Sequence, residues 1–272
     1  MSAVDLHADV LGRADGPTVL VLAGGAAAHP SYLGDLAGLG ERYRLVVPHL
    51  RGVGRSSAAP LASRWEQMDD VDRLRASSGL DRCAVVAHSA GTRLAVAYAA
   101  RFPERLSALV LVTPPAEYLV DVPSDVPDLL AARAGEPAVA SALAALEGGP
   151  GLTDDDFTAW RLRTAPLGYA RWDATTRAHA EGMRYSLAAA RAFMAGDAPD
   201  GLRERLPAMT APVLVVAGAQ DAAAGCAPVL AVADAFPRGE AAVVDGCGHF
   251  PWVEQPAAYR AVVGSFLDRA LG

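Results

Sequence analysis

Ser89 stands where a serine could act as a nucleophile. It lies between an apolar run at 83–87 and a stretch with helical spacing of apolar residues at 92–100. The first is typical of a buried parallel strand and the second of a helix. The residues beside the serine are small enough for an abrupt strand-to-helix turn: Ala87, Ala90 and Gly91. This pattern predicts a nucleophile elbow, in which the turn exposes the Ser89 hydroxyl, and disfavours an ordinary polar turn residue.

A serine hydroxyl attacks a carbonyl only when a histidine takes its proton and a carboxylate orients that histidine. His249 lies in a glycine-rich loop directly after the apolar run 241–244, and Asp221 directly follows the run 213–217. Both would therefore stand at the carboxyl ends of strands. The sequence predicts a catalytic triad of Ser89, Asp221 and His249, with three other carboxylates as alternatives for the acid: Asp245, Asp197 and Asp200.

Acyl chemistry also needs hydrogen-bond donors for the developing oxyanion. At an elbow one donor is the backbone N–H after the nucleophile, here that of Ala90. A second comes from the glycine-containing loop 23–27, where we place it on Gly25. His88 neighbours the nucleophile, but successive side chains at the turn point in different directions, so a packing role is expected. Arg51 is expected to brace the turn that begins there.

Apolar runs bounded by turn residues recur along the chain and predict a mostly parallel α/β sheet with helices on both faces. The predicted strands are 18–22, 44–47, 83–87, 109–112, 213–217 and 241–244, with a last helix over 256–271. These apolar runs do not recur between 114 and 207, where helices are expected at 154–163, 175–183 and 185–194. We therefore expect a core domain formed by 1–113 and 208–272, with 114–207 inserted as a helical lid. The lid's aromatic residues would either line a substrate pocket or form the lid's own core; the substrate-contacting candidates are Trp160, Trp172 and Phe193.

At 272 residues, of which 52% are hydrophobic, the composition is that of a globular protein with one large core or with one core plus an insertion. A net charge of −7 with no basic stripe argues against binding to nucleic acid or to an anionic membrane. The chain has no lysine, which excludes Schiff-base chemistry and lysine-anchored phosphate loops. It also has no isoleucine or asparagine, and this bias indicates a bacterial source with a GC-rich genome.

The three cysteines are too few and too scattered for a disulfide framework or a metal cluster. No secretion signal and no membrane-spanning apolar run is apparent, so the cytoplasm is the expected compartment. We expect neither a metal nor another cofactor, and a small-molecule substrate as the partner. The oligomeric state is left open.

Three segments carry a resemblance to a known family. The loop 23–27 with the HPSYL run that follows resembles an HGGPG loop, 49–56 resembles a DxRGxGxS turn, and 87–91 resembles a GHSxG elbow. The chain thus resembles an α/β-hydrolase of the proline iminopeptidase-like branch. It departs from that pattern at Ala23, Ala26 and His49, which stand where the family has histidine, proline and an acidic residue.

The resemblance and the triad together favour a serine hydrolase acting on an ester, thioester or lactone of modest size. A non-hydrolytic lyase, decarboxylase or cyclase of a natural-product pathway could use the same scaffold. A proline iminopeptidase-like aminopeptidase is a further alternative, although no glutamate arrangement for a substrate amino group is evident. A binding module without turnover is disfavoured by the complete set of Ser89, Asp221 and His249.

Overall fold

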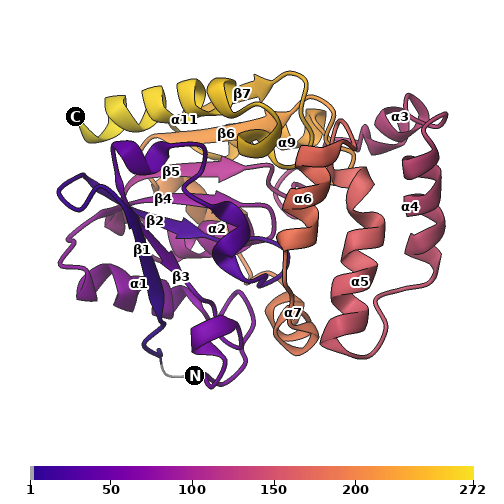
Figure 1. Cartoon of the computed structure of the whole chain (residues 1–272). Coiled ribbons are helices and arrows are strands. Elements are labelled where there is room, and N and C mark those ends of the chain that lie inside the picture. Colours follow the sequence, from indigo (N-terminus) through magenta and orange to yellow (C-terminus); the bar gives the residue numbers. More distant parts are fainter. Residues whose placement is uncertain (1–2) are drawn as a thin grey trace.

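A seven-stranded sheet runs through the centre of the computed structural model, which describes residues 3–272 (Figure 1). The strand order is β1-β3-β2-β4-β5-β6-β7; β1 is antiparallel to β3 and every other neighbouring pair is parallel. The strands are β1 Ala8–Gly12, β2 Thr18–Leu22, β3 Arg44–Pro48, β4 Cys83–His88, β5 Leu106–Val112, β6 Val213–Gly218 and β7 Gly239–Val244. The mostly parallel α/β sheet expected from the sequence is confirmed.

The central strands are continuous apolar runs because both faces of the sheet are covered. Alternate side chains of β2 enter different cores: Leu20 and Leu22 pack with α2, whereas Val19 and Val21 pack with α11. β4 and β6 are buried along their whole length. The rigid layer so formed fixes the carboxyl ends of β4, β6 and β7, after which the three predicted triad residues follow.

Helices lie on both faces of the sheet and beside one of its ends (Figure 1). α1 and α2 contribute to the same core, while α11 closes the opposite face. No described helix is both long and apolar enough to cross a membrane. The helices are α1 Met68–Ser77, α2 Gly91–Arg101, α3 Val126–Ala131, α4 Pro137–Glu147, α5 Asp154–Thr164, α6 Ala174–Gly182, α7 Leu187–Met194, α8 Leu202–Arg205, α9 Ala227–Ala231, α10 Pro251–Glu254 and α11 Pro256–Leu271.

The segment between β5 and β6 holds α3 to α8, and the three helices predicted within it are present. α5 and α6 each begin with a capping box, formed by Thr153 with Asp156 and by Asp173 with Thr176. α7 starts at Leu187, two residues later than predicted, because Tyr185 pairs with Ala28 in an isolated antiparallel bridge. This bridge joins the helical segment to the loop that follows β2.

The edge strand β1 is absent from the sequence-based assignment. Its side chains are half-buried or exposed, so it lacks the apolar run that identified the other strands. Its backbone pairs with β3 from Ala8 opposite Pro48 to Gly12 opposite Arg44. Beyond the ladder, the His49 N–H donates to the carbonyl of His7 at 2.9 Å. Pairing, not burial, thus holds this strand in place.

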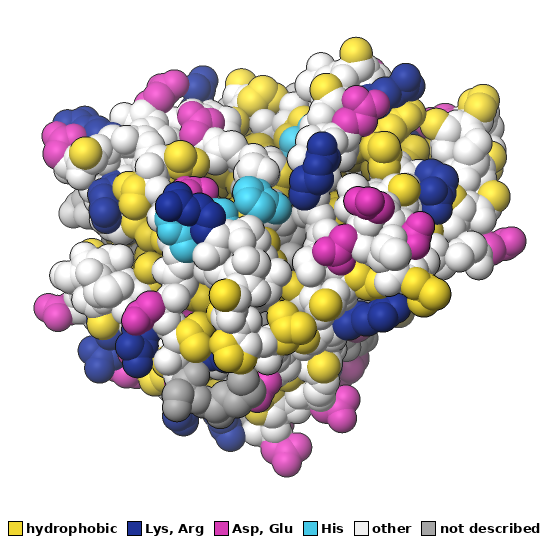
Figure 2. All heavy atoms as spheres, turned by 60° about the horizontal axis from the view of Figure 1, so that its bottom comes forward, with side chains coloured by type: hydrophobic (Ala, Val, Ile, Leu, Met, Phe, Trp, Pro, Cys, Tyr) yellow, Lys and Arg dark blue, Asp and Glu magenta, His cyan; other side chains and the backbone are white. Residues whose placement is uncertain are grey.

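The turn that begins at Arg51 is braced by a buried ion pair. Arg51 Nε and Nη2 donate to the two carboxylate oxygens of Asp70 at 2.6 and 2.8 Å. Asp70 lies in α1, so this bidentate contact ties the turn after β3 to a core helix. The brace expected for Arg51 is present. On the outer face drawn in Figure 2, acidic and basic side chains are interspersed and form no continuous basic stripe.

Candidate active site

Ser89 occupies a strained turn between β4 and α2. Its φ of 49° is in the left-handed region that a non-glycine residue seldom adopts. The turn is held on both sides, since the Ser89 N–H donates to Val112 O and the Thr92 N–H donates to Ser89 O, both at 2.9 Å. A Cβ at Gly91 would lie 2.4 Å from the carbonyl oxygen of Ala23, so only glycine fits there. Strain of this kind, maintained by its surroundings, is typical of functional sites.

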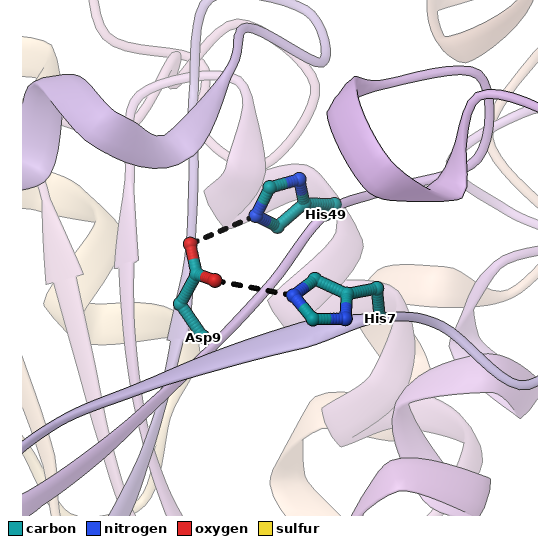
Figure 3. A group of neighbouring side chains, drawn as sticks. All are labelled: His7, Asp9 and His49. Atoms are coloured by element: carbon teal, nitrogen blue, oxygen red, sulfur yellow. Dashed lines mark hydrogen bonds and ion pairs between the residues drawn. The ribbon is translucent and has the colours of Figure 1, made fainter.

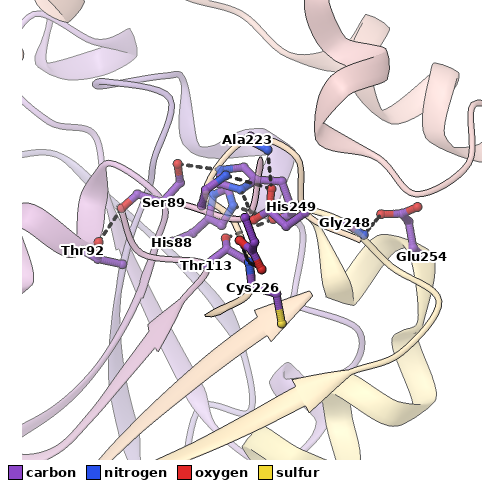
Figure 4. A network of polar contacts seen from close by, with 12 residues as sticks. His88, Ser89, Thr92, Thr113, Ala223, Cys226, Gly248, His249 and Glu254 are labelled. Atoms are coloured by element: carbon purple, nitrogen blue, oxygen red, sulfur yellow. Dashed lines mark hydrogen bonds and ion pairs between the residues drawn. The ribbon is translucent and has the colours of Figure 1, made fainter. Parts of the chain in front are cut away.

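His249 reaches the serine from the loop after β7. Its Nε2 lies 2.7 Å from Ser89 Oγ (Figure 4). The loop is fixed from outside, because the His249 N–H donates to Gly168 O at 2.7 Å. Glu254 accepts from the N–H groups of Gly248 and Ala170, both at 2.8 Å. Burial raises the pKa of this carboxyl group. Glu254 thus holds the loop that carries His249, a role that the sequence did not indicate.

Asp221 lies on the far side of the imidazole, after β6. Its Oδ2 is 2.7 Å from His249 Nδ1, and its side chain is fully buried. Its Oδ1 accepts from the N–H groups of Ala223 at 2.8 Å and Ala224 at 3.1 Å. These contacts fix the carboxylate, which in turn places the histidine proton on Nδ1 and leaves Nε2 to accept from Ser89. The three alternative acids Asp245, Asp197 and Asp200 are exposed.

A second, buried hydrogen-bond chain runs behind the serine. The Gly24 N–H donates to the Tyr32 hydroxyl, which donates to His88 Nδ1, both at 2.7 Å. His88 Nε2 then donates to His249 O at 3.0 Å, where the Thr113 hydroxyl also donates at 3.2 Å. Burial holds the pKa of His88 well below its usual range. A neutral His88 with its proton on Nε2 satisfies both contacts.

This series of hydrogen bonds gives His88 a positioning role as well as the packing role expected from the sequence. It connects the backbone of the loop after β2, where a second oxyanion donor is predicted, to the backbone of His249. Tyr32 is its central member and was not singled out from the sequence, because no local pattern shows which buried tyrosine faces which histidine.

The loop after β2 passes directly beside the serine. A Cβ at Gly24 would lie 2.8 Å from Ser89 Cβ and 2.6 Å from the carbonyl oxygen of His88. Gly25 follows with a φ of 65°, and Ala90 begins the turn into α2 with a φ of −55°. Ala90 thus follows Ser89 directly, and Gly25 is next to the residue that approaches it; their role in binding an oxyanion stays a prediction.

Ser89 and His249 open onto a cavity of about 380 Å³, a size suited to a small ligand. Its outer wall comes from the helical segment. That wall is mostly apolar and includes Leu146, Trp160, Thr164, Leu167, Met183 and Tyr185. A hollow of about 420 Å³ beside α11 is lined by none of the three triad candidates.

Of the three aromatic residues predicted to contact substrate, the structure places one in this wall. Trp160 lines the cavity, whereas Trp172 and Phe193 do not. Phe193 is fully buried in the core that also contains α2. Trp172 packs against Tyr169, with ring centroids 5.6 Å apart, and beneath Arg177. The structure thus places these two residues away from this cavity, a difference that aromatic composition alone could not reveal.

Among the described residues, one group has the composition of a metal site: His7, Asp9 and His49 (Figure 3). Asp9 accepts from His49 Nε2 at 2.9 Å and contacts His7 Nε2 at 3.1 Å. However, the Arg55 N–H donates to His49 Nδ1 at 3.1 Å, so the proton of neutral His49 lies on Nε2. Metal binding there would move that proton to Nδ1, against another donor. The group fits a hydrogen-bonded link between β1 and the end of β3.

The family model of the alpha/beta hydrolase fold matches residues 17–144. A polyketide synthase, ThaQ of Burkholderia thailandensis, is 27% identical over 97% of this chain, which spans 12% of that protein. A proline iminopeptidase of Xylella fastidiosa is 39% identical over 26% of this chain and 24% of its own length. The chain therefore spans only a part of these relatives.

Solved structures of the same fold cover nearly the whole chain. An esterase of Thermogutta terrifontis superposes with a TM-score of 0.70 at 24% identity, covering 98% of this chain and 94% of its own. A proline iminopeptidase of Mycobacterium smegmatis gives a TM-score of 0.67 at 23% identity, covering 97% and 94%. Such identities establish a shared fold and not a shared substrate. Taken with the family model, they show that this chain has the α/β-hydrolase fold and is similar, over part of its length, to proline iminopeptidases.

Proposed function

We propose that the chain is a serine hydrolase that cleaves a carboxylic ester, thioester or lactone of a small molecule. The observation that carries this proposal is the unbroken contact series from Asp221 through His249 to Ser89, with both contacts at 2.7 Å. The series ends at the wall of a cavity. A nucleophile, a base and an orienting acid in this geometry are what acyl transfer to serine requires.

In the proposed reaction, Ser89 Oγ attacks the carbonyl carbon while its proton passes to His249 Nε2. Asp221 stabilises the resulting imidazolium, and the N–H groups of Ala90 and Gly25 receive the oxyanion. Collapse of the tetrahedral intermediate breaks the bond to the alcohol or thiol, which takes the proton from His249. Water then attacks the acyl-enzyme, with His249 as the base, and the acid product leaves as the proton returns to Ser89.

An ester or thioester is favoured over a peptide with a free amino group. Such a peptide presents an ammonium, for which the site would need a carboxylate. The charged lining residue of the helical wall is Arg161, which repels a cation. The likeness along 97% of the chain to a segment of a polyketide synthase also supports an acyl substrate.

The test of the proposal is covalent labelling by a small fluorophosphonate, which reacts only with an activated serine. We expect one equivalent of label, located on Ser89 by peptide mass spectrometry, because His249 Nε2 is already in place to accept the proton. Ser89→Ala should carry no label, and His249→Ala should react far more slowly. Absence of label on the folded wild type, or label at another serine, would contradict the proposal.

We further propose that residues 114–207 act as a lid that selects the acyl group. Replacement of Trp160 by alanine should enlarge the cavity, because its ring lines the wall. The ratio of kcat/KM for p-nitrophenyl octanoate to kcat/KM for the acetate should then rise by about 10-fold. This is within the range by which hydrophobic pockets discriminate between substrates that differ by a methylene group. Steady-state assays of both esters measure this ratio.

The matched control is Trp172→Ala, a tryptophan of the same segment outside the cavity, which should leave the ratio unchanged. Fluorophosphonate labelling of Ser89 should persist in both variants, because a small probe does not need the wall. If folded Trp160→Ala lost labelling as completely as His249→Ala, the helical segment would have to contain part of the catalytic machinery.

A further inference from the structure

Arg161 introduces a single strong charge into an otherwise apolar wall. It lies on α5 and lines the cavity that contains Ser89 and His249. No carboxylate lines this cavity; apart from the Arg161 guanidinium, the titratable lining side chains are those of His249 and Tyr185. The pocket is therefore built for a mainly apolar molecule with one site of defined charge.

The guanidinium of Arg161 has no anionic partner within the described residues 3–272. None of the ion pairs formed by those residues includes it. Its Nε is shielded from solvent and makes no hydrogen bond. Its contact is with the ring of Tyr185, whose centroid lies 5.2 Å from Cζ. Among the buried arginines, Arg51, Arg75 and Arg133 each face a carboxylate, and Arg64 donates to the backbone carbonyls of Phe193 and Gly196.

An unpaired guanidinium in a partly desolvated pocket is unfavourable unless a ligand supplies hydrogen-bond acceptors and a negative charge. A planar fork of N–H donors over an aromatic ring is well suited to a carboxylate, which it can bind with two parallel hydrogen bonds. The charge also lies near the reaction centre. Arg161 lines the same cavity as Ser89 and His249.

We propose that Arg161 binds a carboxylate carried by the substrate, so that the preferred substrates are esters or thioesters whose acyl or leaving group bears a second, anionic carboxyl function. This inference rests on the proposed function and specifies its substrate class. An uncharged chain of the same length would fill the apolar wall but leave Arg161 unpaired. The site would thus select by charge as well as by shape.

The test compares two esters of equal chain length: mono-p-nitrophenyl glutarate, which is anionic, and its methyl ester, which is neutral. Wild type should prefer the anion in kcat/KM. Arg161→Gln should lower the ratio of anionic to neutral substrate by about 10- to 100-fold, the range for hydrogen bonds to charged groups. Arg161→Lys should retain part of the preference, because it keeps the charge but not the fork.

Arg163→Gln is the matched control, since Arg163 is an exposed arginine of the same helix and does not line the cavity. It should leave the ratio unchanged. Equal ratios in folded wild type and Arg161→Gln would overturn the proposal. A fall of the same size in Arg163→Gln would do so too, because it would reflect the overall field of the helix and not a carboxylate site.

A binding experiment separates failure of this inference from failure of the proposed function. Phenylacetate and its neutral amide are titrated into Ser89→Ala, and binding is followed by ligand-observed NMR. Tighter binding of the acid, lost on combination with Arg161→Gln, would support the carboxylate site even if no ester were hydrolysed. Equal binding of acid and amide would overturn it. Clearly tighter binding of benzylphosphonate than of phenylacetate would also overturn it, by assigning the site to a phosphate group.

Discussion

Ser89→Ala is expected to reduce hydrolysis of a p-nitrophenyl ester by about six orders of magnitude, a loss known for catalytic serines of proteases. The physical reason is that, among residues 3–272, Ser89 Oγ is the side-chain hydroxyl in hydrogen-bond contact with His249 Nε2, at 2.7 Å. The measurement is kcat under saturating ester, with the fold checked by circular dichroism and thermal unfolding. Because alanine replaces another non-glycine residue at a φ of 49°, backbone strain in the turn should change little.

Ser77→Ala serves as the control, since this serine lies exposed in α1. It should retain full activity. Turnover that survives in Ser89→Ala on a natural substrate would exclude the covalent mechanism. It would favour the lyase, decarboxylase or cyclase interpretation, in which His249 and Asp221 act as an acid–base pair and no acyl-enzyme forms.

The parts of this protein that were predictable from its sequence are those fixed by local pattern. Buried strands such as β4 and β6 are continuous apolar runs, and their positions were predicted within about one residue. The elbow needs small residues around Ser89, and these are visible in the sequence. Asp221 and His249 could be inferred because residues that follow parallel strands meet at one edge of the sheet.

Features that depend on pairing across the fold were not predictable in this way. β1 is defined by its hydrogen bonds to β3 and not by its own hydrophobicity. The hydrogen bond from Tyr32 to His88 joins residues 56 positions apart. For the same reason the sequence cannot show that Phe193 faces a core while Trp160 faces a cavity. Nor can it show that Arg161 lacks a carboxylate, because any of the acidic residues could have been its partner.

The acid of the triad is tested by Asp221→Asn, which should lower kcat by about four orders of magnitude, by analogy with the same change in the serine protease triad. The amide has nearly the shape of the carboxylate. Its oxygen can still accept from the N–H groups of Ala223 and Ala224, which now bind Asp221 Oδ1. Its NH₂ group would then face His249 Nδ1.

A donor in that position requires Nδ1 to accept a hydrogen bond, so the histidine proton moves to Nε2. Nε2 can then no longer accept the proton of the Ser89 hydroxyl. The loss should therefore appear in kcat and in the rate of fluorophosphonate labelling, with little change in thermal stability. Asp245→Asn provides the comparison, since Asp245 is an exposed residue at the end of the neighbouring strand β7 and should cost little activity. If Asp245→Asn were the damaging variant and Asp221→Asn nearly silent, His249 would have to turn toward the other carboxylate during catalysis, and the tautomer argument would apply to Asp245 instead.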